Sequence, residues 1–254
     1  MKIVVLIKQV PDTAEERILD PATGRLDREA SDAVIDEIAE RALELALSVK
    51  DGDKSTEVVV ATMGPKEALK SIRKALSMGA DSGIHVLDDG LAGADLVVTA
   101  SVLAAALRDT GADLFIAGNE STDGRAGMLP AMIAEHLGLP LLGSLVAADI
   151  SAQSVSGQRA TEAGTQDVSA AYPAIVTVTE RFAEARFPNF KGIMGAKRKP
   201  VSTLSAAELG DTGQISSSVL EVSQRPPRTA GAKITDDGNA AAQLVDFLAS
   251  RRLI

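Results

Sequence analysis

The stretch "ADLFIAGNESTDGRAGMLPAMIAEHLG", which covers Ala112 to Gly138, decides the fold class of this chain. It begins with a short apolar run, continues with glycine and small polar residues, and ends in an apolar pattern with helical spacing. This order predicts a buried strand, a loop and a helix that closes on Gly138. The N-terminus of such a helix can bind a phosphate, but the pattern fits a plain capped turn equally well. From the residues alone, both interpretations stand.

The chain before this stretch alternates in the same way between strand and helix patterns. Apolar β-branched runs at residues 2–10, 56–64 and 82–88 alternate with helical spacing at residues 28–50, 65–80 and 94–111. Ser31 or Asp32 is the expected cap of the first helix. This alternation predicts a Rossmann-like α/β fold, with a parallel sheet and helices on both faces.

The pattern changes after residue 140. Residues 144–180 contain short strand patterns with polar connections, which predict antiparallel pairing. Residues 181–200 look irregular and end in a basic stretch, and we expect Phe182 and Phe187 to lie in the core beneath them. The remainder predicts an extended arm and an amphipathic terminal helix. We therefore expect an α/β domain over residues 1–200 and a C-terminal arm over residues 201–254.

Composition excludes several classes of function. The net charge of −9 argues against nucleic-acid binding, which needs a basic face. The absence of cysteine excludes disulfides, cysteine-ligated metals and thiol nucleophiles, and the two histidines make a hydrolytic triad or a metal site a poor expectation. No apolar stretch approaches the length of a membrane span, and the N-terminus fits a first strand better than a signal peptide. We expect a cytoplasmic chain with no membrane insertion, no catalytic residues and no metal.

Ligands of open α/β sheets bind beyond the carboxyl ends of the strands. Three such ends are candidates here: "IKQVPDT" after the first strand, "ATMGP" after the second and "AGNESTDGRAG" after the fourth. The third is the best anion site, because its glycines permit close backbone approach and a helix follows it. It is neither a P-loop nor a G-x-G-x-x-G fingerprint.

The motifs "MKIVVLIKQVPDT", "ATMGP", "IRKALSMGAD", "FIAGNESTDG", "YPAIVTVTE", "ARFPNFKGIMGAKRKP" and "RTAGAKI" stand in this order along nearly the whole chain. In order and spacing the chain resembles the beta subunit of electron transfer flavoprotein, and in particular its actinobacterial members. The resemblance implies an adenine nucleotide α-hydrolase-like fold and a heterodimer with an alpha subunit. It also implies electron relay from acyl-CoA and other dehydrogenases to a membrane quinone oxidoreductase. FAD would lie mainly on the alpha subunit, and this chain would bury an AMP or a second FAD.

The resemblance also implies a nucleotide site. Its residues are Leu6, Thr62, Met63, Gly64, Gly118, Asn119, Glu120, Ser121, Thr122, Asp123, Gly124, Arg125 and Gly127. The common family loop reads Gly-x-Gln-Ala-Ile-Asp-x-Asp. Asp123 matches it, whereas Glu120 and Arg125 replace the Gln and the second Asp, and Met128 and Leu129 stand at usually polar positions. These departures leave the choice between AMP and a second FAD open.

The segment 184–199 matches the loop with which the family recognises dehydrogenases. An exposed apolar side chain there, commonly leucine, fills a hydrophobic pocket on the partner, and Phe190 occupies that position. We expect Lys191, Ile193 and Met194 to dock beside it. We also expect the arm, from about Arg225 to Ile254, to pack on the alpha subunit. Its start is too rich in Pro and Gly to lie in a sheet interior, and its terminal helix needs a surface for Leu244, Phe247 and Leu248.

Two alternatives remain. An ATP-using enzyme of the adenine nucleotide α-hydrolase type would need a glycine-rich loop after the first strand, where "KQVPDT" has Pro11 and no glycine. A stand-alone nucleotide-sensing module would not need the arm or the basic docking segment. The sequence does not name the dehydrogenases that the protein serves.

Overall fold

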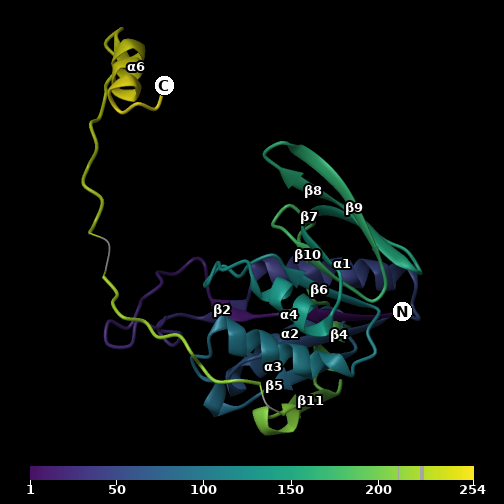
Figure 1. Ribbon diagram of the computed structural model, residues 1–254. Helices are drawn as coiled ribbons and strands as arrows, with labels where there is room; N and C mark the ends of the chain where they lie inside the picture. The colour runs from purple at the N-terminus through teal and green to yellow at the C-terminus, as the bar shows by residue number, and fades with distance from the viewer. Residues whose placement is uncertain (211, 224–225) are drawn as a thin grey trace. The chain divides into compact units, whose positions relative to one another are not determined.

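A computed structural model describes residues 1–210, 212–223 and 226–254 (Figure 1). These residues divide into two compact units, Met1–Leu220 and Glu221–Ile254. The first unit holds a nine-stranded sheet with the order β11-β5-β4-β1-β6-β10-β7-β8-β9, counted over the described residues. The second holds the terminal helix.

The elements follow the chain as expected for an α/β fold. The strands of the main sheet are β1 (Lys2–Leu6), β4 (Glu57–Met63), β5 (Ser82–Val86), β6 (Leu114–Gly118), β7 (Leu141–Ile150), β8 (Ser154–Thr161), β9 (Gly164–Ala171), β10 (Ala174–Val178) and β11 (Val201–Leu204). A separate ribbon pairs β2 (Gln9–Pro11) with β3 (Ala33–Ile35). The helices are α1 (Glu37–Gly52), α2 (Leu69–Met78), α3 (Leu96–Arg108), α4 (Leu129–Leu137), α5 (Phe190–Ala196) and α6 (Ala240–Ser250), with short 3-10 turns at Lys66–Ala68, Asp89–Leu91 and Ala206–Leu209.

Helices cover both faces of the sheet because alternate side chains of a strand point to opposite faces. In β1, Ile3 and Val5 lie in the same buried cluster as the apolar faces of α1 and α2. Val4 lies in a second cluster with α3 and α4. The predicted parallel sheet with helices on both faces is therefore confirmed.

The strand order reverses beside β1. β1 pairs in parallel with β4 on one side and with β6 on the other. The chain first moves outward through β4 to β5 and later returns to β6 and β10. The segments that follow β1 and β6 therefore separate at the carboxyl edge of the sheet, which is the usual place for a ligand in such folds.

The first helix begins later than predicted. Val34 and Ile35 belong to β3, which pairs antiparallel with β2, and α1 starts at Glu37. Asp36 is its cap, so the expected caps Ser31 and Asp32 were wrong. The reason is that pairing with β2 fixes the chain up to residue 35 in an extended conformation, which the helical spacing of the apolar residues did not reveal.

Two expectations for the second half also need correction. β10 is not antiparallel: it pairs in parallel with β6 and with β7, and all five of its residues are buried, as suits a central parallel strand. Among the described strands of the main sheet, the antiparallel pairing is confined to β7, β8 and β9. The segment 181–200 is not irregular throughout, because it contains α5 with Asn189 as its cap.

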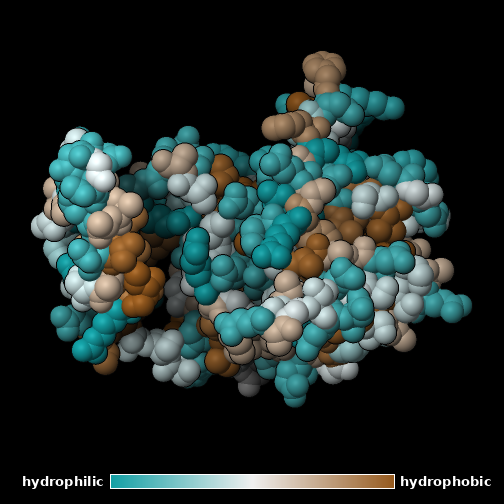
Figure 2. Space-filling model, turned by 90° about the horizontal axis from the view of Figure 1, so that it is seen from above, coloured by the Kyte–Doolittle hydropathy of each residue, from teal (hydrophilic) through white to brown (hydrophobic). Residues whose placement is uncertain are grey.

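The arm begins later than the boundary after residue 200. Residues Val201–Leu204 form β11, which pairs with β5, and the first unit extends to Leu220. In the second unit, α6 has no buried residue, and Leu244, Val245 and Phe247 are about half exposed. Figure 2 shows brown side chains gathered on this helix, at the left of the view. Residues 224 and 225, where we expected the arm to leave the core, lie outside the described residues.

Candidate functional site

The loop after β6 lies at the point where the strand order reverses. Gly118 ends β6 and pairs with Val178, and the backbone N–H of Asn119 donates to the Val178 carbonyl at 2.8 Å. A side chain at position 118 would meet Ile38 of α1 at 3.0 Å from its Cβ. Gly118 thus lets the loop start close against the N-terminus of α1, which no larger residue would permit without displacement.

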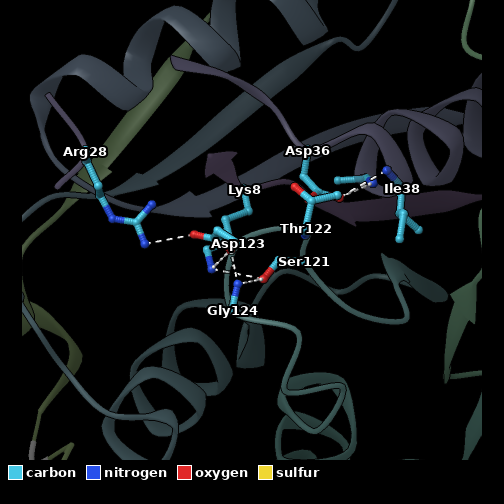
Figure 3. Close-up of polar contacts among 9 residues, drawn as sticks. Lys8, Arg28, Asp36, Ile38, Ser121, Thr122, Asp123 and Gly124 are labelled. Carbon is cyan, nitrogen blue, oxygen red and sulfur yellow. Dashed lines mark hydrogen bonds and ion pairs between the residues drawn. The ribbon is translucent and has the colours of Figure 1, made fainter. Parts of the chain in front are cut away.

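Asp36 ties this loop to α1. Its Oδ1 accepts hydrogen bonds from the backbone N–H groups of Ile38 (3.0 Å) and Ala39 (3.3 Å). Its Oδ2 accepts from both the backbone N–H (2.6 Å) and the hydroxyl (2.8 Å) of Thr122. Asp36 is 1% exposed and Thr122 is 6% exposed. One buried carboxylate therefore caps the helix and fixes the middle of the loop (Figure 3).

Asp123 lies between two cations from other parts of the chain (Figure 3). Its Oδ1 is 2.7 Å from Lys8 Nζ, and its Oδ2 is 2.8 Å from Arg28 Nη2. Lys8 follows β1 and also donates to the Ser121 hydroxyl at 3.1 Å. Arg28 comes from the segment between β2 and β3. The cluster joins the two chain segments that separate at the carboxyl edge.

The electrostatics of Asp123 favour its charged form. Burial raises the pKa of its carboxyl, but the hydrogen bond and charge of Lys8, together with Ser121 and Arg28, outweigh burial. The pKa therefore lies well below its usual range. The side chain of Asp123 is 1% exposed, whereas those of Lys8 and Arg28 are 41% and 49% exposed. Solvent screens the two cations, so each ion pair contributes less than a buried one would.

The second half of the loop presents unused hydrogen-bond donors. No described residue accepts from the backbone N–H groups of Ala126, Gly127 or Met128. α4 begins directly after them and has no side-chain cap. Arg125 is exposed, has a left-handed φ of 49° and forms no ion pair within the described chain. Free N–H groups at a helix N-terminus suit an anionic ligand.

One buried acceptor in the loop is also unused. The side-chain oxygen Oδ1 of Asn119 is buried and has no hydrogen-bond partner among the described residues. A buried polar atom without a partner carries a free-energy cost, which a ligand with a donor group would remove. Together with the free N–H groups, this atom is compatible with a nucleotide, which offers both an anionic phosphate and donor groups on its sugar and base.

The structure brings together only part of the predicted nucleotide site. Ser121, Thr122 and Asp123 lie in one polar cluster. Leu6 ends β1, Thr62 and Met63 end the neighbouring strand β4 at the same edge, and Gly64 follows β4. Within the described chain, no hydrogen bond or ion pair joins Thr62–Gly64 to the 118–127 loop, and Thr62 is buried.

Three residues that hold the loop were missed by sequence reasoning. They are Lys8, Arg28 and Asp36. The sequence did offer a signal for Lys8, because a cation directly after a buried strand lies at the ligand edge of the sheet. Asp36 was hidden within a pattern that predicted a continuous helix, and nothing local distinguishes Arg28 from other exposed arginines.

Other places in the described chain are weaker candidates. A hollow of about 680 Å³ lies at the opposite, amino edge of the sheet, where Met1, Thr56 and Asp113 precede their strands. Sites in parallel sheets lie at the carboxyl edge, so we favour the loop after β6 over this hollow. Among the described residues, no group of three metal-ligating side chains comes together. None of the described helices is long and apolar enough to cross a membrane.

The segment 184–199, which we expected to dock dehydrogenases, presents apolar side chains to solvent. Phe190 is 80% exposed, and Ile193 and Met194 are about half exposed. Phe187 is 96% exposed, so the expectation that it lies in the core was wrong. Phe182 packs against the core as expected. The physical reason is that the chain beyond Phe182 runs along the outside of α1 and α2, where no layer covers it.

The comparisons with known proteins agree with this arrangement. The model of the electron transfer flavoprotein domain family matches residues 23–209. The chain is 48% identical to the electron transfer flavoprotein subunit beta of Mycobacterium leprae and 47% identical to that of Mycobacterium tuberculosis, with 99% of each chain covered. It is also 31% identical, over 100% of both chains, to a subunit of the caffeyl-CoA reductase–Etf complex of Acetobacterium woodii.

The chain belongs to the electron transfer flavoprotein family. Family membership extends over nearly its whole length, since the beta subunits of the two mycobacteria match from end to end. Electron transfer as part of a flavoprotein is therefore its function. Its fold is the mixed α/β arrangement described above.

Proposed function

We propose that this chain is the beta subunit of a heterodimer that relays electrons from acyl-CoA and other dehydrogenases to a membrane quinone oxidoreductase. The observation that carries the proposal is identity of 47–48% to beta subunits over 99% of both chains. The relative from Acetobacterium woodii, named as part of a complex with a CoA-ester reductase, supports a dehydrogenase acting on CoA esters as the partner. The chain acts as a carrier and docking subunit, without catalytic residues of its own.

An adenine nucleotide binds at the loop after β6, in an adenine nucleotide α-hydrolase-like fold. The backbone N–H groups of Ala126, Gly127 and Met128 would hold its phosphate, and Asn119 would accept from its sugar or base. Asp36 and Asp123 orient the loop through their protein partners. When bound in the heterodimer, FAD supplies the redox chemistry. The beta chain fixes the nucleotide and presents the surface that docks the dehydrogenase.

Phe190, Lys191, Ile193 and Met194 form the docking surface. Its support is the exposure of the three apolar side chains, since monomeric proteins rarely leave such residues grouped in water without a binding role. In the arm, α6 packs on the alpha subunit through Leu244, Val245 and Phe247, each of which is about half exposed.

The structure gives less support to an ATP-using enzyme. Such an enzyme needs a free glycine-rich loop after β1 to hold a pyrophosphate. Here Gln9–Pro11 forms β2 and pairs with β3, so the backbone of that segment is already engaged.

The test is the cofactor content of the heterodimer purified after co-expression with its alpha subunit. An absorption spectrum and nucleotide extraction should give one flavin and one AMP, or two flavins, for each heterodimer. Recovery of one flavin and no other nucleotide would contradict the nucleotide site. Failure of the purified heterodimer to accept electrons from any acyl-CoA dehydrogenase would contradict the relay.

A further inference from the structure

We propose that Phe187 is a second docking anchor beside Phe190, and that the ion pairs of Arg186 hold the segment between them in its binding conformation. The inference rests on the proposed docking function and adds a residue to it. Phe187 is the more exposed of the two rings, at 96% against 80%. A large aromatic side chain in water has no stabilising role in the free subunit, whereas such rings dominate binding interfaces.

The chain before Phe187 is fixed to α1. The Arg186 guanidinium binds Glu44 through Nε (2.8 Å) and Nη2 (2.7 Å), and its Nη1 lies 2.7 Å from Asp51. The backbone N–H of Arg186 also donates to Glu44, at 3.0 Å. The hydrogen bond to Glu44 raises the pKa of the guanidinium, so its charge persists at all working pH values. A guanidinium that binds a carboxylate through two of its nitrogens is fixed in orientation as well as in position.

The chain after Phe190 is fixed to α2. The Asn189 side chain caps α5 by accepting from the Gly192 N–H at 2.8 Å. A side chain at position 192 would meet the Ser77 carbonyl oxygen at 2.2 Å from its Cβ, so glycine allows α5 to lie directly on α2. At the end of α5, Arg73 donates to the carbonyls of Ala196 and Lys199, both at 2.8 Å.

Phe187 and Phe190 therefore lie in a short segment that is attached to α1 at one end and to α2 at the other. Pro188 lies between them and restricts the backbone further. A segment that is already ordered loses little conformational entropy when it binds, and this raises affinity without adding contacts. The two rings are three residues apart in the chain, and both are exposed.

The occupant that fits this surface is a dehydrogenase with an apolar pocket and a carboxylate rim. Lys191 lies in α5, Lys197 and Arg198 directly follow it, and none of the three forms an ion pair within the described chain. They form a local basic group on a chain whose net charge is −9. Charge of this sign favours an acidic partner surface and speeds the encounter.

The experiment uses the intact heterodimer as electron acceptor for a purified acyl-CoA dehydrogenase reduced by its acyl-CoA substrate. The variants are Phe187→Ala, Phe190→Ala, Arg186→Gln and the double variant Arg186→Gln with Phe187→Ala. Val97→Ala is the control, since Val97 is an exposed apolar residue on α3. Phe187→Ala should raise the apparent KM for the heterodimer about tenfold, with kcat, flavin content and melting temperature unchanged. Val97→Ala should change none of these.

Arg186→Gln tests the positioning role. It should raise KM with kcat unchanged, and its effect should be smaller in the Phe187→Ala background, because the two residues act through one contact. A change in melting temperature alone, with KM unaltered, would refute that role.

The outcomes separate the two proposals. If Phe190→Ala raises KM while Phe187→Ala does not, the second anchor is wrong and the docking surface stands. If neither variant changes KM, both are wrong. If Phe187→Ala instead releases the alpha subunit, the ring belongs to the heterodimer interface and the inference is overturned.

Discussion

Replacement of Asp36 by alanine should loosen the loop after β6 and destabilise the chain. Asp36 accepts four hydrogen bonds: two from the first turn of α1 and two from Thr122. Alanine would leave the helix without a cap and would leave the Thr122 N–H and hydroxyl buried without their acceptor. Both losses act on the loop that we propose for the nucleotide.

The magnitude follows from these contacts. Loss of a helix cap costs about 1 kcal/mol. A buried donor that loses a charged partner costs about 1–3 kcal/mol, and the Thr122 hydroxyl can turn to another acceptor while its N–H cannot. We expect a total near 3 kcal/mol, which for a chain of this size lowers the melting temperature by roughly 6–12 °C. Asn at position 36 keeps one acceptor and should give an intermediate loss.

The assay is thermal unfolding of the co-purified heterodimer, followed by measurement of the nucleotide that it retains. Asp95→Ala is the comparison variant, because Asp95 also caps a helix, α3, but its other partners are Ser216 and Ser217 and not the loop after β6. The control should lose about 1 kcal/mol, or roughly 2–4 °C in melting temperature, and should keep its nucleotide. The reasoning is refuted if Asp36→Ala melts within about 2 °C of the wild type.

Three other predictions follow from the structure. The low pKa of Asp123 means that its ion pairs stabilise the fold fully above its ordinary value near 3.8 and lose this contribution as the pH falls through the folded-state value. The gap in melting temperature between the wild type and Asp123→Asn should thus be constant from about pH 8 to 5 and narrow below about pH 4, and a gap that widens in acid would contradict this. Phe190→Ala should weaken docking by roughly 2 kcal/mol, or tens of fold in apparent KM, and leave the melting temperature unchanged. A lower melting temperature with normal docking would mean that Phe190 stabilises the fold and does not dock the dehydrogenase. A chain ended after Leu220 should lose most of its affinity for the alpha subunit in co-purification, and normal recovery of the complex would exclude α6 as its contact.

The amino-acid sequence alone determined the alternation of strands and helices and the position of the loop after β6. Continuous apolar runs of this length suit strands buried between two layers, so the strands 2–6, 57–63 and 114–118 could be recognised without partners. The helix end at Gly138 was equally local, because its left-handed φ of 66° suits glycine. The family resemblance, tied to particular motifs, supplied the function that the comparisons support.

Tertiary structure decided everything that depends on residues distant in the chain. Asp36 caps α1 instead of Ser31 or Asp32 because β3 pairs with β2, and no local pattern records that pairing. Lys8, Arg28 and Asp123 meet only because the strand order reverses beside β1 and brings three separate segments to one edge. Phe187 is exposed because Arg186 binds α1 and no layer lies above it. Burial and ion pairing depend on what the rest of the chain places nearby, and a residue's own neighbours in sequence do not contain that information.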